Sequence, residues 1–317
     1  MNVPVKNQSR SDDWPDLPWH KWSETAATLH LFTQVIGKIR LTRMPWCNHS
    51  WHVALYPTAR GLSTGPIAFD GRVAEMRFDF VDHQLLIDLA DGRTRNVTLR
   101  DRSVAEFYHA VMDNLGQLAL DCRIHTTPSE IADAIPFEED ETHNSYDPEY
   151  ANRFHRAILQ MHRVFTEFRA GYLGKVSPMH FFWGSFDLAV TRFSGRDAPV
   201  HPGGVPNFPD WVAAEAYSHE VSSAGFWPGG GGIDYPAFYS YAYPAPDGFS
   251  NAMVGPAEAY FSADLGEFIL PYDAVRSAES PDHALLEFLQ TTYDAAADLG
   301  RWDRASLERP PGGFRPA

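Results

Sequence analysis

The sequence has little cysteine, no long apolar run and no concentration of basic residues. Its two cysteines, Cys47 and Cys122, are too few for a disulfide framework or a four-cysteine zinc site. No eighteen uncharged apolar residues run together, and the first thirteen residues, MNVPVKNQSRSDD, lack the apolar core of a signal peptide. We therefore expect a cytoplasmic protein whose cysteines are reduced and packed.

The charge balance excludes two classes of partner. The formal net charge is −15, and no cluster of Lys and Arg is present to bind the phosphates of nucleic acid or an anionic membrane surface. Hydrophobic residues make up 44% and aromatic residues 14%, as in a packed globular protein. A small-molecule ligand is the expected partner, and the oligomeric state is left open.

Local signals in the first half predict two helices around a group of strands. Ser23 is a good N-cap and Gly37 a good stop, so a helix is expected over 23–36. S-V-A-E at 103–106 is a capping box that begins a second helix. Alternating apolar residues predict strands at 50–57, 75–81, 84–90 and 94–99.

The second half begins after an acidic stretch that is rich in turn formers. Asp147 and Pro148 cap a long helix, on which His155 and His162 lie beside the apolar stripe. Packing or rim positions are favoured for these two histidines, and a shared ligand site is the alternative. Ser280 and Pro281 begin a last helix over 281–299. Further strands are expected at 185–193, 237–243, 257–263 and 266–271. The predicted division is an N-terminal lobe 1–120, a linker 121–147, a C-terminal lobe 148–300 and a loose tail 301–317.

Short matches between the halves suggest an internal duplication. Residues 37–39, G-K-I, match residues 174–176, G-K-V, and S-W-H-V-A-L at 50–55 matches S-F-D-L-A-V at 185–190. We predict an α+β fold with two similar lobes, each a mainly antiparallel sheet packed against helices. Small and polar residues alternate along 185–191, so that face of the strand is covered by solvent or lines a cleft between the lobes.

Established cofactor motifs are missing. The sequence has no P-loop, no dinucleotide fingerprint, no H-E-x-x-H and no G-x-S-x-G. The glycines at 229–232 lack the Lys and hydroxyl of a phosphate loop, although aromatic residues flank them. This turn is either mobile over a pocket or an irregular surface loop.

The segment before these glycines carries an acid and a histidine four residues apart. Glu215 and His219 point the same way in a helix and in a strand, which suits an acid/base pair or two ligands of one metal. Glu220 lies on the reverse face of a strand or a quarter turn away on a helix.

A second candidate group lies at 178–196. Burial would keep His180 neutral, and Asp187 faces the predicted cleft. Arg192 and Arg196 could anchor an anionic substrate, although alternation puts Arg192 and Asp187 on opposite faces. The plain alternative is a core histidine and surface ion pairs.

Two histidines and a carboxylate from these groups could hold one divalent metal ion. The candidates are His180, His219 and one of Glu215, Glu220 or Asp187. The leading hypothesis is an enzyme that acts on a small polar or anionic molecule by acid/base or metal-assisted chemistry. The alternatives are a binding or sensor protein, in which aromatic residues such as Trp183, Trp227 and Tyr241 hold the ligand, and an interaction protein.

Several long motifs resemble a known family. These are H-F-F-W-G-S-F-D-L-A-V-T-R-F-S-G-R, Y-S-H-E-V-S-S-A-G-F-W-P-G, W-x-D-L-P and T-L-H-x-x-x-Q-V-I-G-K-I-R-L. The chain resembles, over nearly its whole length, the bacterial family catalogued as domain of unknown function 5996. The resemblance implies a bacterial protein that forms a single unit, and it supplies no activity.

Overall fold

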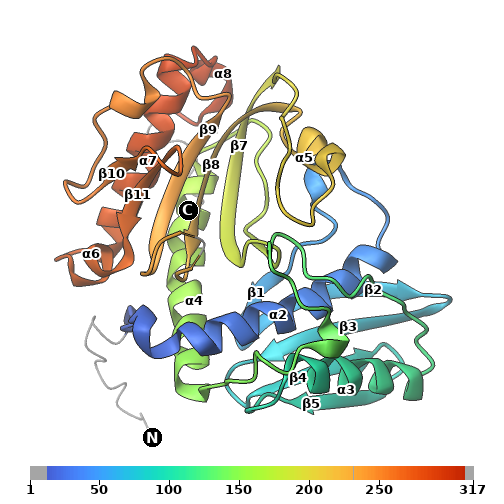
Figure 1. Cartoon of the computed structure of the whole chain (residues 1–317). Coiled ribbons are helices and arrows are strands. Elements are labelled where there is room, and N and C mark those ends of the chain that lie inside the picture. The colour runs from blue at the N-terminus through green and yellow to red at the C-terminus, as the bar shows by residue number, and fades with distance from the viewer. Residues whose placement is uncertain (1–12, 231, 311–317) are drawn as a thin grey trace, which may run out of the picture.

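A computed structural model describes residues 13–230 and 232–310 as two antiparallel sheets with helices between and beside them (Figure 1). The first sheet is a meander in which each strand pairs with the next, and α3 (Val104–Gln117) covers it. The predicted cap of α3 is confirmed, because the Ser103 side chain accepts a hydrogen bond from the Glu106 amide. The strands are β1 (Tyr56–Thr58), β2 (Gly61–Phe69), β3 (Arg72–Asp79), β4 (Gln84–Leu89) and β5 (Thr94–Thr98).

Helix α2 (Trp19–Arg43) lies between the two sheets and is longer than predicted (Figure 1). Gly37 does not end it. A Cβ on Gly37 would lie 2.2 Å from the Trp183 indole, so this glycine allows close packing of the indole rather than a helix stop. Every residue from Leu31 to Arg40 is buried, as expected of a helix that is covered on all sides.

The predicted strand at 50–57 is wrong over most of its length. Residues Asn48–Ser50 form a 3₁₀ turn in which His49 and Ser50 both have a φ of 57°, which a strand cannot accommodate. Only Tyr56–Thr58 is a strand, and Leu55 pairs with Phe181 in a single bridge between the two sheets. Strand β2 was missed because Gly65 and Pro66 interrupt its pattern at a bulge.

The second sheet has six strands in the order β10-β11-β9-β8-β7-β6. Its inner face packs on α4 (Pro148–Ala170) and α7 (Pro281–Leu299), and the bounds of α7 agree with the prediction. The strands are β6 (His180–Phe182), β7 (Asp187–Asp197), β8 (His219–Trp227), β9 (Ala237–Tyr243), β10 (Tyr260–Ser262) and β11 (Glu267–Pro271). Shorter helices are α5 (Asp210–Ala216), α6 (Tyr272–Ser277) and α8 (Arg304–Leu307), the last within the tail that was predicted to be loose.

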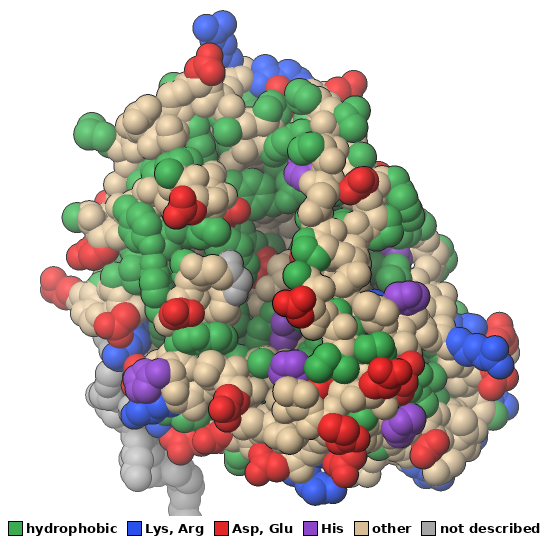
Figure 2. Space-filling view, viewed as in Figure 1, with side chains coloured by type: hydrophobic (Ala, Val, Ile, Leu, Met, Phe, Trp, Pro, Cys, Tyr) green, Lys and Arg blue, Asp and Glu red, His purple; other side chains and the backbone are tan. Residues whose placement is uncertain are grey.

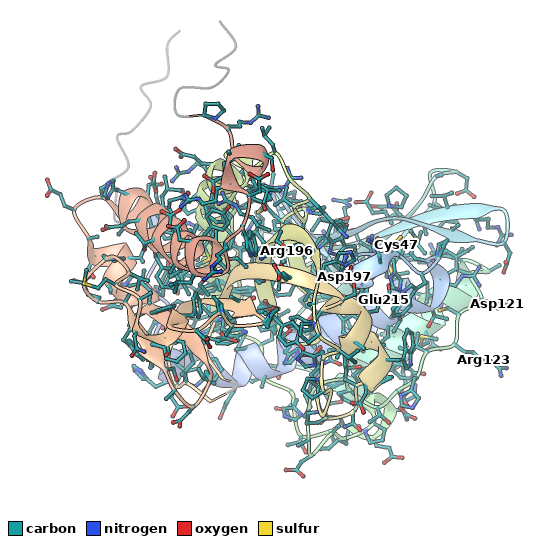
Figure 3. All side chains as sticks on the ribbon, turned by 90° about the horizontal axis from the view of Figure 1, so that it is seen from above. Cys47, Asp121, Arg123, Arg196, Asp197 and Glu215 are labelled. Carbon is teal, nitrogen blue, oxygen red and sulfur yellow. The ribbon has the colours of Figure 1, made fainter. Side chains whose placement is uncertain are left out.

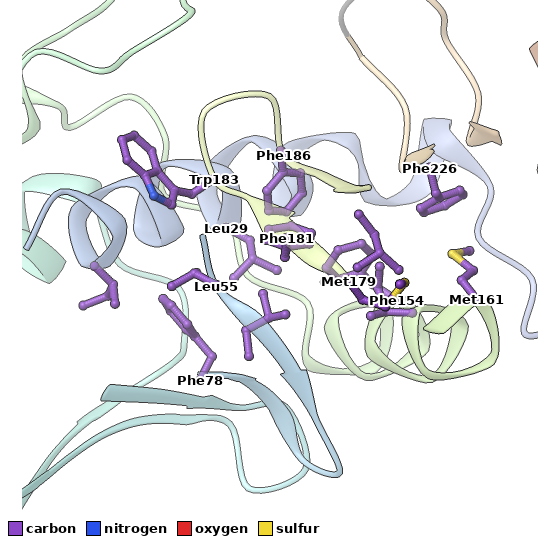
Figure 4. Packing of buried hydrophobic residues seen from close by; sticks show 14 of the residues in the cluster. Leu29, Leu55, Phe78, Phe154, Met161, Met179, Phe181, Trp183, Phe186 and Phe226 are labelled. Carbon is purple, nitrogen blue, oxygen red and sulfur yellow. The ribbon is translucent and has the colours of Figure 1, made fainter. Parts of the chain in front are cut away.

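One cluster of buried apolar residues joins both sheets. Figure 4 shows Leu55 and Phe78 from the first sheet close to Leu29 of α2, with Phe181 and Phe186 beside Phe154 of α4. Described residues from both predicted lobes therefore share one hydrophobic core.

The two sheets do not confirm the internal duplication. Residues 37–39 lie inside α2, whereas residues 174–176 belong to a non-helical segment before β6. Residues 50–55 form a turn, whereas most of 185–190 is in β7. The matched letters thus adopt different conformations, and the sheets differ in strand number and order.

Candidate functional site

The outer face of the second sheet carries small and polar residues around a hollow. Pairing places Ala189, Gly225 and Tyr239 in one row across β7, β8 and β9, and Thr191, Ser223 and Tyr241 in the next. Figure 2 shows the hollow near the centre of the view, with hydrophobic side chains around it and acidic ones at its margin. The sequence left two alternatives for this face, solvent or a cleft. The hollow supports the cleft.

Asp187 lies at the start of β7 and is buried on this face. The Tyr239 hydroxyl donates to its Oδ2, while its Oδ1 accepts no hydrogen bond of ordinary geometry from a described residue. Burial raises the pKa of Asp187 to about 6. A Cβ on Gly225 would lie 2.3 Å from the Tyr239 hydroxyl, so the glycine leaves the space through which Tyr239 reaches Asp187.

Two more carboxyl groups lie near Asp187. Burial, and then the charge of Asp187, raise the pKa of Glu130 to about 7 and that of Glu267 to about 8. The Ser185 hydroxyl partly opposes this shift in Glu130 and in Asp187. Glu267 Oε2 is buried without a hydrogen-bond partner in the described chain. Ionisation of Asp187 therefore disfavours ionisation of Glu130 and of Glu267.

Helix α2 holds the backbone of the segment that precedes Glu130. The Gln34 side-chain amide exchanges two hydrogen bonds with the Ser129 backbone, at 2.8 and 2.9 Å, and Lys38 donates to the Thr127 carbonyl at 2.7 Å. Glu130 itself has a φ of 64°, a conformation that few residues other than glycine adopt and that tends to mark functional sites. A Cβ on Gly184 would lie 2.0 Å from Glu130 Oε1, so the carboxyl rests against bare backbone.

Aromatic rings form much of the wall. The hydroxyls of Tyr217 and Tyr241 lie 2.8 Å apart, the His201 ring stacks on Tyr217 at 4.6 Å, and Trp227 stacks on Tyr239 at 4.4 Å. Burial raises the pKa of Tyr217 to about 12, and the charges of Glu267, Glu130 and Asp187 act in the same direction. Tyr217 therefore keeps its proton and stays a hydrogen-bond donor.

Glu215 and His219 do not form the predicted pair. Helix α5 ends at Ala216 and β8 begins at His219, so no single periodicity relates the two side chains. Both Glu215 carboxylate oxygens accept from the Trp46 indole, at 2.9 and 2.8 Å. The His219 ring instead contacts the Ser218 hydroxyl at 3.0 Å and lies 3.7 Å from an Asp197 oxygen.

His180 is buried in an aromatic box made by Trp51, Tyr56 and Phe182. Burial lowers its pKa to about 3, which is the direction predicted. Neither ring nitrogen has a hydrogen-bond partner among the described residues, and Asp187 is not one of its ring neighbours. On helix α4, the buried His155 donates a hydrogen bond from Nε2 to the Thr58 carbonyl at 2.9 Å, as a packing residue would.

The two predicted anchoring arginines are engaged elsewhere. Arg192 lies on the inner face, opposite Asp187 as alternation predicted, where it donates to the Phe168 carbonyl and stacks on the Phe168 ring at 3.5 Å. Arg196 pairs with Glu220 and donates to the Gly300 carbonyl at 2.6 Å. Figure 3 shows Arg196 and Asp197 near the end of β7, with Glu215 on α5 nearby.

The residues predicted to contact a ligand or to bind a metal do not come together in one site. Trp227 and Tyr241 belong to the hollow, whereas Trp183 is buried against Gly37 and donates to the Val53 carbonyl at 2.9 Å. Across residues 13–230 and 232–310, no three His, Cys, Asp or Glu side chains are grouped so that they could hold a metal ion. His180, His219 and Glu220 therefore do not assemble the metal site considered above.

The glycine turn folds back on the N-terminal segment. A Cβ on Gly229 would lie 2.3 Å from the Trp19 ring, and Gly230 pairs with Ile233. Gly229, Gly230 and Gly232 have positive φ, and Gly231 lies outside the described residues. The glycines thus allow a tight turn against a tryptophan at the end of β8.

Fold and site together define an α+β protein with a carboxyl-lined hollow on one face of an antiparallel sheet. No helix in the described chain has the length and apolar character needed to cross a membrane. The chain belongs to the family of unknown function DUF5996, whose model matches residues 14–309 of 317, as the sequence motifs indicated. Comparisons with curated proteins and with solved structures found no match.

Proposed function

We propose that the protein is an enzyme that acts on a small polar molecule in the hollow on the second sheet. One observation carries the proposal: Asp187 is buried on the hollowed face of the second sheet, its charge acts on Glu130 and Glu267, and the three carboxyls have pKa values of about 6, 7 and 8. A general acid or base works best when its pKa is close to the working pH, and structural carboxyls on a surface have no need of such a shift.

The three pKa values suggest a division of roles. At pH 7 Asp187 is mainly ionised and suits the general base, whereas Glu267 is mainly protonated and suits the general acid. Glu130 and Glu267 are only partly buried, whereas Asp187 is buried, so the two glutamates are more open to an entering ligand. Tyr217 stays protonated beside all three and could donate a hydrogen bond to a developing negative charge.

The donor and acceptor groups favour one substrate class. Carboxyl oxygens without partners accept hydrogen bonds, so the ligand should carry hydroxyl or amino groups. Arg192 and Arg196 are held by other groups, which supports the polar rather than the anionic half of the expectation from the sequence. Rings of Tyr217 and Trp227 offer flat surfaces to the apolar face of such a molecule.

A turnover screen tests the proposal without a known substrate. Wild-type protein, Asp187→Asn and Glu130→Gln are each incubated with a deproteinised extract of small metabolites, and mass spectrometry follows compounds that disappear or form. We expect the wild type to convert a hydroxyl- or amino-bearing compound, and Asp187→Asn to convert it at least about 100-fold more slowly. Glu279→Gln, at an exposed position, is the matched control and should behave as wild type.

The aromatic residues of the hollow also fit one alternative function, that of a binding or sensor protein that performs no chemistry. In that case a compound is retained by the wild type on gel filtration and returns unchanged. Conversion that survives in Asp187→Asn at the wild-type rate would contradict the assigned role of this hollow.

A further inference from the structure

Lys175 and His49 form a second group, at the junction between the two sheets. The Lys175 ammonium donates to His49 Nε2 at 2.5 Å. It also lies over the rings of Trp51 and Phe193, at 5.5 and 4.7 Å from their centroids. Lys175 follows the end of α4 and precedes β6, while His49 belongs to the turn before β1, so residues 126 positions apart meet here.

The surroundings of Lys175 are poor in negative charge. Aromatic rings and an imidazole surround the ammonium, and burial lowers its pKa with no carboxylate acting against that shift. Lysine is also rare in the chain, which has Lys6, Lys21, Lys38 and Lys175 beside 22 arginines. Lys175 is exposed as a residue, and its ammonium contacts an imidazole and two aromatic rings rather than a carboxylate. Arginine would hold a structural ion pair better, so a lysine in these contacts suggests another use.

His49 is oriented as a proton acceptor. Its Nδ1 lies 2.9 Å from the Ala216 carbonyl, which only accepts, so Nδ1 carries the hydrogen and Nε2 presents a lone pair to Lys175. The φ of 57° at His49 and at Ser50 is unfavourable for both residues, yet it turns the imidazole toward Lys175. An amine, a base within hydrogen-bond reach and a third group that orients the base are the signature of an activated nucleophile.

Neighbouring charged groups leave this arrangement intact. The His219 ring lies edge-on to His49 at 5.8 Å, and Glu215 acts on His49 from α5 while both its oxygens are held by Trp46. Burial is the main cause that lowers the pKa of His49, and the Lys175 charge adds to it. The Lys175 charge therefore favours the neutral form of His49, the form that can accept a proton.

From this geometry we infer that Lys175 is a nucleophilic amine that forms an imine with a small aldehyde or ketone, with His49 Nε2 as its base. His49 takes one proton from the Lys175 ammonium, and the freed amine lone pair attacks the carbonyl carbon. One N–H proton passes to the carbonyl oxygen to give the carbinolamine. Its hydroxyl then leaves as water with the proton returned by His49, and the nitrogen lone pair forms the C=N bond of a protonated imine that keeps the last N–H proton. The inference does not depend on the carboxyl groups of the hollow.

Reductive trapping tests the inference in the intact protein. Wild-type protein is treated at pH 7 with a small amount of propionaldehyde and sodium cyanoborohydride, which reduces any imine to a stable secondary amine. Peptide mapping then compares Lys175 with exposed Lys21 in the same molecules. We expect Lys175 to be alkylated faster than Lys21, because its lowered pKa leaves more of the amine neutral at pH 7 and His49 Nε2 is placed to accept the ammonium proton.

Variants separate the base from the amine. His49→Gln should slow alkylation of Lys175 about ten-fold or more and leave Lys21 unchanged, whereas His109→Gln, at an exposed site on α3, should change neither rate. Lys175→Arg should remove the label at 175. Equal rates at Lys175 and Lys21 in the wild type would overturn the inference, and this comparison needs no variant to fold. A rate at Lys175 that is unchanged in folded His49→Gln would overturn the role of His49.

Discussion

Burial on the second sheet raises the pKa of the Asp187 carboxyl group. The group is almost fully covered, one oxygen accepts from Tyr239 and the other lacks a described partner, so the neutral form is favoured. Its pKa in the folded state, about 6, is above the usual 3.8. Stability from this group is therefore complete below pH 3.8 and is lost as the pH rises through about 6.

The first prediction follows from the loss of stability that Asp187 causes as the pH rises. The difference in free energy of unfolding between Asp187→Asn and wild type should shift in favour of the variant by about 2.4 kcal/mol between pH 4 and pH 8. Asparagine keeps an acceptor for Tyr239 but cannot ionise. Urea unfolding at several pH values gives the difference, and Asp197→Asn, which changes an exposed carboxyl on the same strand, should follow the wild type. A difference that is constant with pH would show that Asp187 titrates normally.

His180 gives a second prediction, with the opposite sign. Its pKa in the folded state is lowered from 6.5 to about 3, so the stability that neutral His180 provides is lost as the pH falls below 6.5. His180→Phe removes two unpartnered nitrogens from an aromatic box. Relative to wild type, the variant should gain about 2 kcal/mol between pH 7.5 and pH 5.

Thermal unfolding across this pH range tests the second prediction. His109→Gln, which changes an exposed histidine, serves as the reference and should keep the pH dependence of the wild type. If His180→Phe and wild type lose stability in parallel on acidification, His180 is protonated in the folded state and the aromatic box does not keep it neutral.

Sequence reasoning found some of the site at this scale and missed the rest for a physical reason. Alternation along β7 correctly put Asp187 and Arg192 on opposite faces, and the strand register puts Tyr241 and Trp227 on the same face as Asp187. Glu130 was missed because it lies in an irregular segment with no period to interpret. Its partners Gln34 and Gly184 are distant in sequence, and only folding brings them together.

At the scale of elements, α2 offers a third prediction. Gly37→Ala should destabilise the protein by about 1–3 kcal/mol, since the new Cβ would meet the Trp183 indole at 2.2 Å. The usual effect of this change inside a helix is a gain of up to about 1 kcal/mol. Gly116→Ala in α3 has nothing within 4 Å and should show that gain. Urea unfolding of both variants measures the contrast, and equal effects would mean that Trp183 moves aside freely.

Elements with local signals were predicted well, and those set by distant contacts were not. Ser103 and Asp147 cap α3 and α4 through their own side chains, and β9 and α7 have the expected bounds. Gly37 inside α2 is packed by Trp183, and His49 in the turn before β1 is contacted by Lys175 and by the Ala216 carbonyl. Neither dependence is visible within a short window of sequence.

At the scale of the whole molecule, the continuous core leads to a fourth prediction. Because one apolar cluster joins both sheets through α2 and α4, the protein should unfold in a single cooperative transition. Far-ultraviolet circular dichroism and tryptophan fluorescence should give coincident curves in urea. Two separated transitions would indicate that the first 120 residues and the C-terminal part are independent units.

The close packing of α2 against residues 183–186 also bears on the order in which the chain is made. His30 Nε2 lies 2.8 Å from the Gly184 carbonyl and its ring stacks on Phe186. One side of this helix is therefore covered by residues more than 150 positions later in the chain. During synthesis the first sheet can leave the ribosome while one side of α2 is still bare and apolar. The nascent N-terminal part therefore waits, exposed to aggregation and to chaperones, until the hairpin of β6 and β7 emerges and closes over it.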